Sequence, residues 1–313
     1  MQKIWQGVFW KILSCGCFAG INILVRYLSG GSALPLDKPL PIYSIMFFQN
    51  ILGMLLISIW IWNSSGNINN LKTTKPWLHL LRVVTAAIGI GLMYLSLRYI
   101  PVTQAVALGL LAPIITVLGA IVFLKESFNL QRKLAVFLSI LGGGLIARPD
   151  QALINFSSYS WFMLLPIIAA FLFAIDKLLT RQLLTNNESA SALAWYLLTF
   201  MTPLSIIPML YYGWMSPTLT HLPWLLLLGV LGVLAHYAFN KAYAVAEVTF
   251  LIPFGAAKII LSIALSYLVF YEIPRSFDIW LGIIFIILST LVLSLKPLIF
   301  TKQRNLATDP NLG

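Results

Sequence analysis

One basic residue, Lys258, stands inside an apolar stretch long enough to cross a lipid bilayer, residues 248–272 (VTFLIPFGAAKIILSIALSYLVFYE). An ammonium group at bilayer depth costs roughly 2.5–3.5 kcal/mol on insertion scales, so it must face protein, water or a ligand. Lys258 could bond to the carbonyl groups of a neighbouring helix, or it could face a polar cavity. We favour the cavity because Lys258 lies near the middle of the stretch, and a mid-membrane cavity is typical of transporters.

The preceding apolar stretch carries a second polar set. Gly229, Gly232, His236 and Asn240 fall on one helical face. Small residues let a neighbouring helix approach closely or leave room for a ligand. We expect His236 and Asn240, four residues apart, to point together toward that space. The alternative is a hydrogen-bonded packing stripe that binds nothing, and a lone histidine is also a candidate proton relay.

Prolines interrupt two apolar stretches at similar depth, Pro113 in one and Pro253 in the other. Proline lacks the amide hydrogen that the preceding turn requires, so each should loosen its helix. Interrupted helices are a good pointer to a transporter site. With the polar and aromatic residues near these depths, the expected substrate-binding set is Lys258, His236, Asn240, Tyr94, Gln104, Asn22, Pro113 and Phe254.

The acidic residues have more than one interpretation. Asp176 could be a coupling carboxylate, but we favour an ion pair with Lys177 or Arg181 near the membrane surface. Glu126 and Glu272 end two apolar stretches beside basic residues, and we expect them to fix loops.

Residues for catalysis or metal binding do not assemble into a known pattern. The histidines, His79, His221 and His236, are dispersed, and no H-E-x-x-H, G-x-S-x-G or Walker sequence occurs. Cys15 and Cys17 lie two apart without a further cysteine or nearby histidine, which favours packing roles. We therefore expect no catalytic residues, no metal and no cofactor.

The composition is that of a membrane protein. Of 313 residues, 60% are hydrophobic and 9% are charged, whereas soluble domains carry about 25% charged residues. The apolar runs are continuous rather than alternating, which excludes a membrane β-barrel. The net charge of +11 is spread between the apolar runs, so we expect no nucleic acid partner. The first apolar run lacks a clear cleavage site, so we interpret it as a span and not a removed signal peptide.

Ten apolar segments can be marked, and all are expected to be helices because helices satisfy their own backbone hydrogen bonds in lipid. They cover residues 8–29, 42–62, 77–97, 102–124, 131–147, 160–180, 191–212, 221–243, 248–270 and 277–296. The connections are too short to hold a soluble domain.

The basic residues set the orientation, because cytoplasmic loops carry an excess of Lys and Arg. With the N-terminus inside, fourteen basic residues fall on the inner side and four on the outer side. Arg26 and Lys258 lie at membrane depth and belong to neither group. We therefore expect both termini in the cytoplasm. The inner set is Lys3, Lys11, Lys72, Lys75, Arg82, Lys125, Arg132, Lys133, Lys177, Arg181, Lys241, Lys296, Lys302 and Arg304.

The two halves of the chain resemble each other. Several pairs match in order: Trp10 with Trp161, Arg26 with Lys177, Pro76 with Pro223, Thr103 with Thr249, and Glu126 with Glu272. Ordered matches at similar offsets indicate an internal repeat. Because each half has five spans, an odd number, the second half must be inverted relative to the first, as in secondary transporters.

Residues 94–126 (YLSLRYIPVTQAVALGLLAPIITVLGAIVFLKE) and 242–272, together with the glycine-rich LGGGL of 141–145, resemble the drug/metabolite transporter superfamily of EamA type. The resemblance covers about residues 8–297. LHLLR (78–82), VTQA (102–105) and YEIP (271–274) are similar to the S-adenosylmethionine uptake branch, whereas FGAAK (254–258) differs from it.

This resemblance implies an all-α polytopic membrane protein with ten transmembrane helices in two inverted five-helix EamA repeats, residues 8–147 and 160–297, followed by a cytoplasmic tail, residues 298–313. It also implies a secondary transporter of the inner membrane that works by alternating access. The expected substrate is a small polar or amphipathic metabolite such as an amino acid, an amino-acid derivative or an S-adenosylmethionine-like solute. The expected partners are that solute and the lipid bilayer, and a homodimer is left open.

Two other functions compete with transport. An intramembrane lipid-modifying enzyme would need a nucleophile and a base that converge at the interface, and the sequence does not supply them. A non-transporting membrane scaffold would bind solute without flux.

Overall fold

The computed structural model describes residues 2–32, 34, 38–65, 71, 73–116, 118, 130–147, 161–186, 188–246, 251, 253–274 and 276–294. Within these residues the chain forms ten α-helices and a short 3-10 helix, without a strand. The all-α polytopic fold is therefore confirmed. Glu126, Glu247 and the predicted tail, residues 298–313, lie outside the described residues.

The helices divide evenly between the two halves of the chain. The first half contains α1 (Gln2–Leu28), α2 (Ile42–Ser65), α3 (Pro76–Tyr99), α4 (Val102–Gly109) and α6 (Leu130–Ala147). The second half contains α9 (Leu164–Thr185), α10 (Ala190–Tyr212), α11 (Leu222–Val245), the 3-10 helix η2 (Pro253–Ala256), α13 (Ala257–Phe270) and α14 (Phe277–Ser294).

Length and apolar composition let five of the ten described α-helices cross a bilayer by themselves. These are helices α1, α2, α3, α10 and α11, whereas the shorter apolar helices are Val102–Thr116, Lys133–Ala147, Phe254–Phe270 and Phe277–Val292. Helix α9 differs because it carries Asp176, Lys177 and Arg181. Charged side chains in a spanning helix indicate a polar environment inside the bundle.

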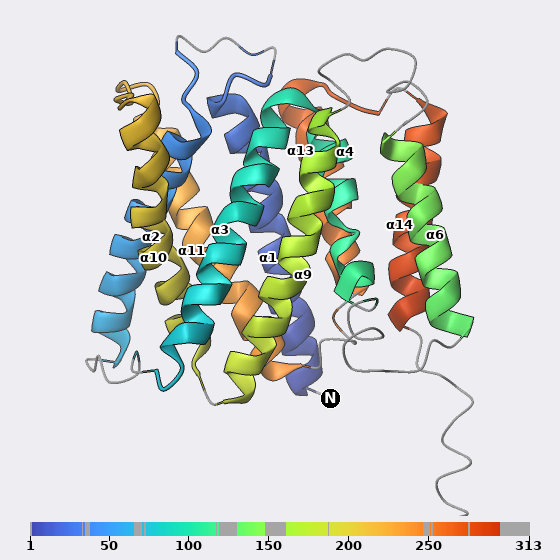
Figure 1. Ribbon diagram of the computed structural model, residues 1–313, viewed down its shortest axis with the longest axis horizontal. Coiled ribbons are helices and arrows are strands. Elements are labelled where there is room, and N and C mark those ends of the chain that lie inside the picture. Colours follow the sequence, from blue (N-terminus) through green and yellow to red (C-terminus); the bar gives the residue numbers. More distant parts are fainter. Residues whose placement is uncertain are drawn as a thin grey trace, which may run out of the picture.

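The main contacts between helices are symmetric: each remains when every helix is replaced by its counterpart in the other half. Helix α1 packs against α11 as its counterpart α9 packs against α3, and α1 contacts α13 as α9 contacts α4. The pairs α2–α10 and α6–α14 join each helix to its own counterpart. In Figure 1, α1 rises from the N-terminus at the bottom, whereas α9 runs downward. The two five-helix halves therefore have opposite senses, and the predicted inverted repeat is confirmed.

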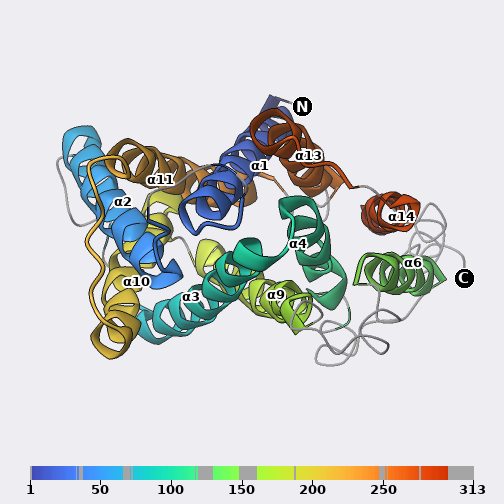
Figure 2. The ribbon, with the colours of Figure 1, turned by 90° about the horizontal axis from the view of Figure 1, so that it is seen from above.

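Viewed from above, α2 and α10 lie at one end of the bundle and α6 and α14 at the other (Figure 2). Glycines bring α6 and α14 into backbone contact. A Cβ atom added at Gly142 would lie 2.6 Å from the carbonyl oxygen of Gly282, and one added at Gly282 would lie 2.7 Å from that of Gly142. Only glycine fits at this crossing.

Both predicted helix interruptions occur. Helix α4 ends at Gly109, a turn covers residues 110–111, and helical structure resumes at 112–116 around Pro113. In the second half, η2 begins at Pro253 and α13 begins only at Ala257. Lys258, near the middle of the apolar stretch 248–272, therefore stands close to the predicted break. Lys258 is the second residue of α13, because the chain around Pro253 does not continue as an α-helix.

Candidate functional site

A cavity of about 170 Å³ lies between the two halves of the bundle. Its lining comes from α1, α3 and α4 of the first half, from α9, α10, α11, α13 and α14 of the second, and from the segments that interrupt α4 and precede α13. One water molecule needs only about 15 Å³ by this measure, so the cavity has room for a solute. Along α1 the lining runs from Lys11 to Asn22, a distance of about 16 Å.

Five of the eight predicted binding residues line this cavity: Lys258, His236, Tyr94, Asn22 and Pro113. The hydroxyl group of Tyr94 donates a hydrogen bond to Gln49 Oε1 at 2.7 Å, which fixes the ring. The Nδ2 atom of Asn22 is buried without a hydrogen-bond partner in the described residues. Asn22 thus keeps an unpaired, buried donor at the wall of the cavity.

The other three predicted residues do not line the cavity. Asn240 is fully buried and donates a hydrogen bond to the Ala190 carbonyl at 3.2 Å, so the expectation that it points with His236 toward the solute is wrong. The N-terminal end of α10 occupies the space beside Asn240. Gln104 is buried in α4 away from the cavity, and Phe254 packs in a cluster with Val8. The neighbour of Phe254, Gly255, lines the cavity instead.

The glycine face of α11 serves packing. A Cβ atom added at Gly229 would lie 2.8 Å from Leu52 Cβ, and one added at Gly232 would lie 3.1 Å from the side chain of Gln49. Helix α2 therefore fills the space beside these glycines. His236, one turn farther along α11, reaches the cavity, where its ring packs edge-on against Phe18 with centroids 5.3 Å apart.

Three cationic side chains in the lining were not predicted as site residues: Lys11, Arg82 and Lys177. They were counted only among the basic residues of the inner side, but Lys11 and Arg82 are 6% and 1% exposed and all three line the cavity. The signal that could have found them is their position inside the predicted spans 8–29, 77–97 and 160–180.

Asp176 pairs with a residue of another helix. Its Oδ1 atom lies 3.2 Å from Arg82 Nε, so the expected ion pair with Lys177 or Arg181 is wrong. The Arg82 side chain also donates hydrogen bonds to Thr180 Oγ1 at 2.8 Å and to the Leu193 carbonyl at 2.9 Å. Arg82 therefore ties α3 to α9 and α10 at the wall of the cavity.

Aromatic rings lie close to two of the ammonium groups, those of Lys11 and Lys258. Lys11 Nζ donates a hydrogen bond to the Tyr243 hydroxyl at 3.0 Å and lies 4.9 Å from the centroids of the Phe239 and Tyr243 rings. Lys258 Nζ lies 5.3 Å from the centroid of the Phe18 ring. Such cation–π contacts stabilise a cation that has left water, and the rings also offer flat apolar surface to a solute.

The cations gather at one end of the cavity. We call the side of the bundle where α1, α3 and α13 begin and α9 ends the N-terminal face (Figure 1). Lys11, Arg82, Lys177 and Lys258 all lie in the half of their helices nearer this face, whereas Asn22 and Tyr94 lie nearer the opposite, far face. The cavity is therefore basic toward the N-terminal face and uncharged toward the far face.

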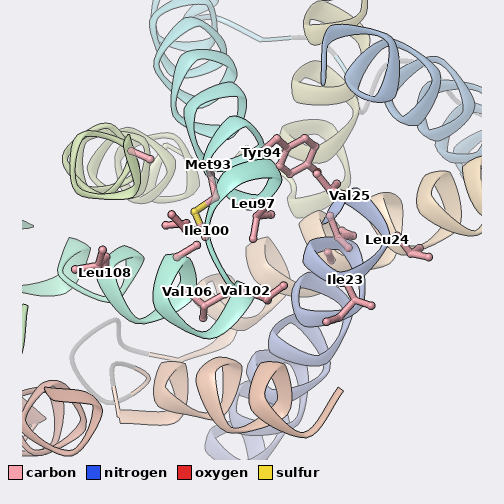
Figure 3. Close-up of a cluster of buried hydrophobic side chains, with 14 of the residues drawn as sticks. Ile23, Leu24, Val25, Met93, Tyr94, Leu97, Ile100, Val102, Val106 and Leu108 are labelled. Carbon is pink, nitrogen blue, oxygen red and sulfur yellow. The ribbon is translucent and has the colours of Figure 1, made fainter. Parts of the chain in front are cut away.

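A buried layer closes the bundle at the far face. The guanidinium of Arg26 donates to the carbonyls of Leu97 and Ile100 at 2.9 and 2.6 Å, and to Glu272 Oε1 at 2.7 Å. Leu97 and Ile100 are fully buried beside Val102, where α1, α3 and α4 meet (Figure 3). Glu272, which was expected to fix a loop, joins the segment after α13 to α1.

Among the described residues no group of three or more His, Cys, Asp or Glu side chains could hold a metal ion. The described lining combines four cations, one carboxylate, neutral polar groups and aromatic rings. Such a mixture can bind an amphipathic solute by stacking and hydrogen bonding.

Comparisons with known proteins agree with this architecture. A family described as the EamA-like transporter family matches residues 5–148 and 160–295. Proteins named riboflavin transporter are 32% identical in Vibrio cholerae serotype O1, covering 91% of each chain, and 30% identical in Rhizobium johnstonii, covering 91% of this chain and 89% of that protein. A protein of Rickettsia bellii named S-adenosylmethionine uptake transporter is 24% identical and covers 86% of each chain. A solved crystal structure has the same fold, with a TM-score of 0.62 and 14% identity over 90% of this chain and 96% of that chain.

Proposed function

Because the chain belongs to the EamA-like transporter family, we propose that it carries its solute by alternating access, with the cavity between the halves as the binding site. The protein is a small-metabolite transporter of the membrane and not an enzyme. The observation that carries the mechanism is a cavity lined by both inverted halves and closed at the far face by the Arg26 contacts.

The proposed orientation places both termini in the cytoplasm, so that the N-terminal face is the cytoplasmic face. Removing Lys11, Arg82 and Lys177 from the loop residues still leaves eleven basic residues inside against four outside. This excess supports the orientation through the positive-inside rule. The far face closed by Arg26 is then the outer face.

The proposed substrate class is a planar heteroaromatic metabolite with polar substituents, and riboflavin is the leading candidate. Relatives named riboflavin transporter support it, as do the rings of Phe18, Phe173 and Phe239 in the lining. Aromatic surfaces stack on a flat ring system. Asn22 and Tyr94 at the uncharged end of the cavity are suited to hydroxyl and carbonyl groups of the solute.

An S-adenosylmethionine-like solute is the second candidate, because relatives bear that name and several sequence motifs resemble that branch. This solute carries a sulfonium and an ammonium against one carboxylate, a net charge of +1. Four cations and one carboxylate in the described lining would repel it. The charge of the cavity therefore favours the flavin.

Uptake into proteoliposomes tests the proposal. Riboflavin accumulation is followed by its fluorescence, with S-adenosylmethionine and amino acids as competitors. We expect saturable riboflavin uptake that Lys258→Ala reduces at least tenfold and Arg181→Ala, an exposed position on α9, leaves unchanged. Saturable binding without flux would support a scaffold, and uptake that Lys258→Ala leaves intact would remove this lysine from the site.

A further inference from the structure

We propose that the basic end of the cavity is an oxyanion-binding subsite, formed by Lys11, Lys177 and Lys258, which takes a phosphate- or carboxylate-type group. This inference rests on the proposed function in treating the cavity as the path of the solute. It adds a requirement for negative charge that an uncharged flavin by itself does not meet.

The three ammonium groups reach one cavity from separate helices. Lys11 comes from α1, Lys177 from α9 and Lys258 from the start of α13. Two of these helices belong to the second half and one to the first, so movement of the halves relative to each other would open or close the cluster. A ligand that bridges the lysines would therefore bind differently in the two states of a carrier.

None of the three ammonium groups has a carboxylate partner within 4.0 Å among the described residues. Lys11 bonds to the neutral hydroxyl of Tyr243 and Lys258 lies over a ring. Asp176 is the one carboxylate in the described lining, and Arg82 already engages it. Like charges in a low-dielectric interior repel strongly unless an opposite charge is supplied. A bound oxyanion supplies it.

The three lysine side chains suit an oxyanion better than a planar group that has to be held in one orientation. Each lysine ammonium is a compact charge with three rotatable donors, which suits phosphate and carboxylate oxygens without fixed geometry. The charge could come from the solute or from a small free anion that enters beside a neutral solute, and the two sources give different results below.

The first measurement is the thermal stability of the purified full-length protein with increasing inorganic phosphate, at constant ionic strength made up with sodium chloride. We expect a saturable rise in the melting temperature. Lys177→Gln and Lys258→Gln should each weaken the apparent phosphate affinity at least about tenfold. Lys177→Arg should retain it, and so should Arg181→Gln, which removes an exposed charge one turn along α9. No saturable effect in the parent protein, or an unchanged effect in both glutamine variants, would overturn the subsite.

The second measurement compares binding of riboflavin and riboflavin 5′-phosphate by fluorescence quenching. If the solute carries the charge, the phosphate ester binds more tightly and inorganic phosphate competes with it. If a free anion is the source, inorganic phosphate strengthens binding of neutral riboflavin. If phosphate stabilises the parent protein but not the lysine variants, and neither flavin binds, the subsite is retained and the proposed flavin substrate is rejected. If flavin binding and uptake depend neither on phosphate nor on Lys177 and Lys258, the proposed carrier function is retained and the subsite is rejected.

Discussion

Replacing Asp176 with Asn tests whether the cavity wall depends on a buried ion pair. The substitution keeps the size of the side chain but removes the charge that lies 3.2 Å from Arg82 Nε. Arg82 is 1% exposed, so its guanidinium has almost no contact with solvent. Its hydrogen bonds to Thr180 and to the Leu193 carbonyl remain, but they carry no negative charge.

The expected loss can be stated from this geometry. Removing one partner of a buried ion pair costs about 3–5 kcal/mol, because the other charge stays buried without compensation. The two remaining hydrogen bonds of Arg82 place the expected cost near the lower end, about 3 kcal/mol. At about 2–4 °C per kcal/mol, the melting temperature should fall by about 6–12 °C.

The assay is thermal unfolding of the purified protein in detergent, run as a double-mutant cycle. Asp176→Asn and Arg82→Met should each destabilise the protein, whereas Asp176→Asn combined with Arg82→Met should lose less than the sum of the single changes by about 2 kcal/mol. Arg181→Met on the same helix is the exposed control. Additive losses in the cycle, or a neutral Asp176→Asn variant, would refute the view that the pair stabilises the wall.

Other substitutions test the packing and the closed face. Gly142→Ala should destabilise the protein by about 1–3 kcal/mol, because its Cβ would meet a carbonyl of α14 at 2.6 Å. The control Gly144→Ala, whose Cβ would meet nothing within 4 Å, should be neutral. Equal melting temperatures of the two variants would contradict the close backbone contact of α6 and α14. Tyr94→Phe should lower stability by about 1 kcal/mol through the lost hydrogen bond and weaken solute binding, and an unchanged variant would show that the hydroxyl is dispensable. Glu272→Gln should cost about 1 kcal/mol, because a neutral amide oxygen replaces the carboxylate that accepts from Arg26. It should also speed thiol labelling of an Asn22→Cys variant from the far face, and slower or equal labelling would argue against closure there.

Local properties of the chain decided the elements of this fold. Apolar length predicted the helices, and the repeated order of matched residues predicted two inverted halves. Pro113 and Pro253 marked the interruptions, since a missing amide hydrogen acts within one turn. Lys258 was identified for the same reason, because the cost of a charge in an apolar stretch follows from the stretch itself.

The tertiary structure decided which polar groups meet. His236 and Asn240 share a helical face in the sequence, yet one lines the cavity and the other bonds to α10, because each level of α11 has a different neighbour. The partner of Asp176 is Arg82 of the other half, although basic residues stand nearer in sequence. The sequence by itself determined the helices, their breaks and the opposite senses of the halves. The lining of the cavity depended on distances across the bundle, which no local pattern records.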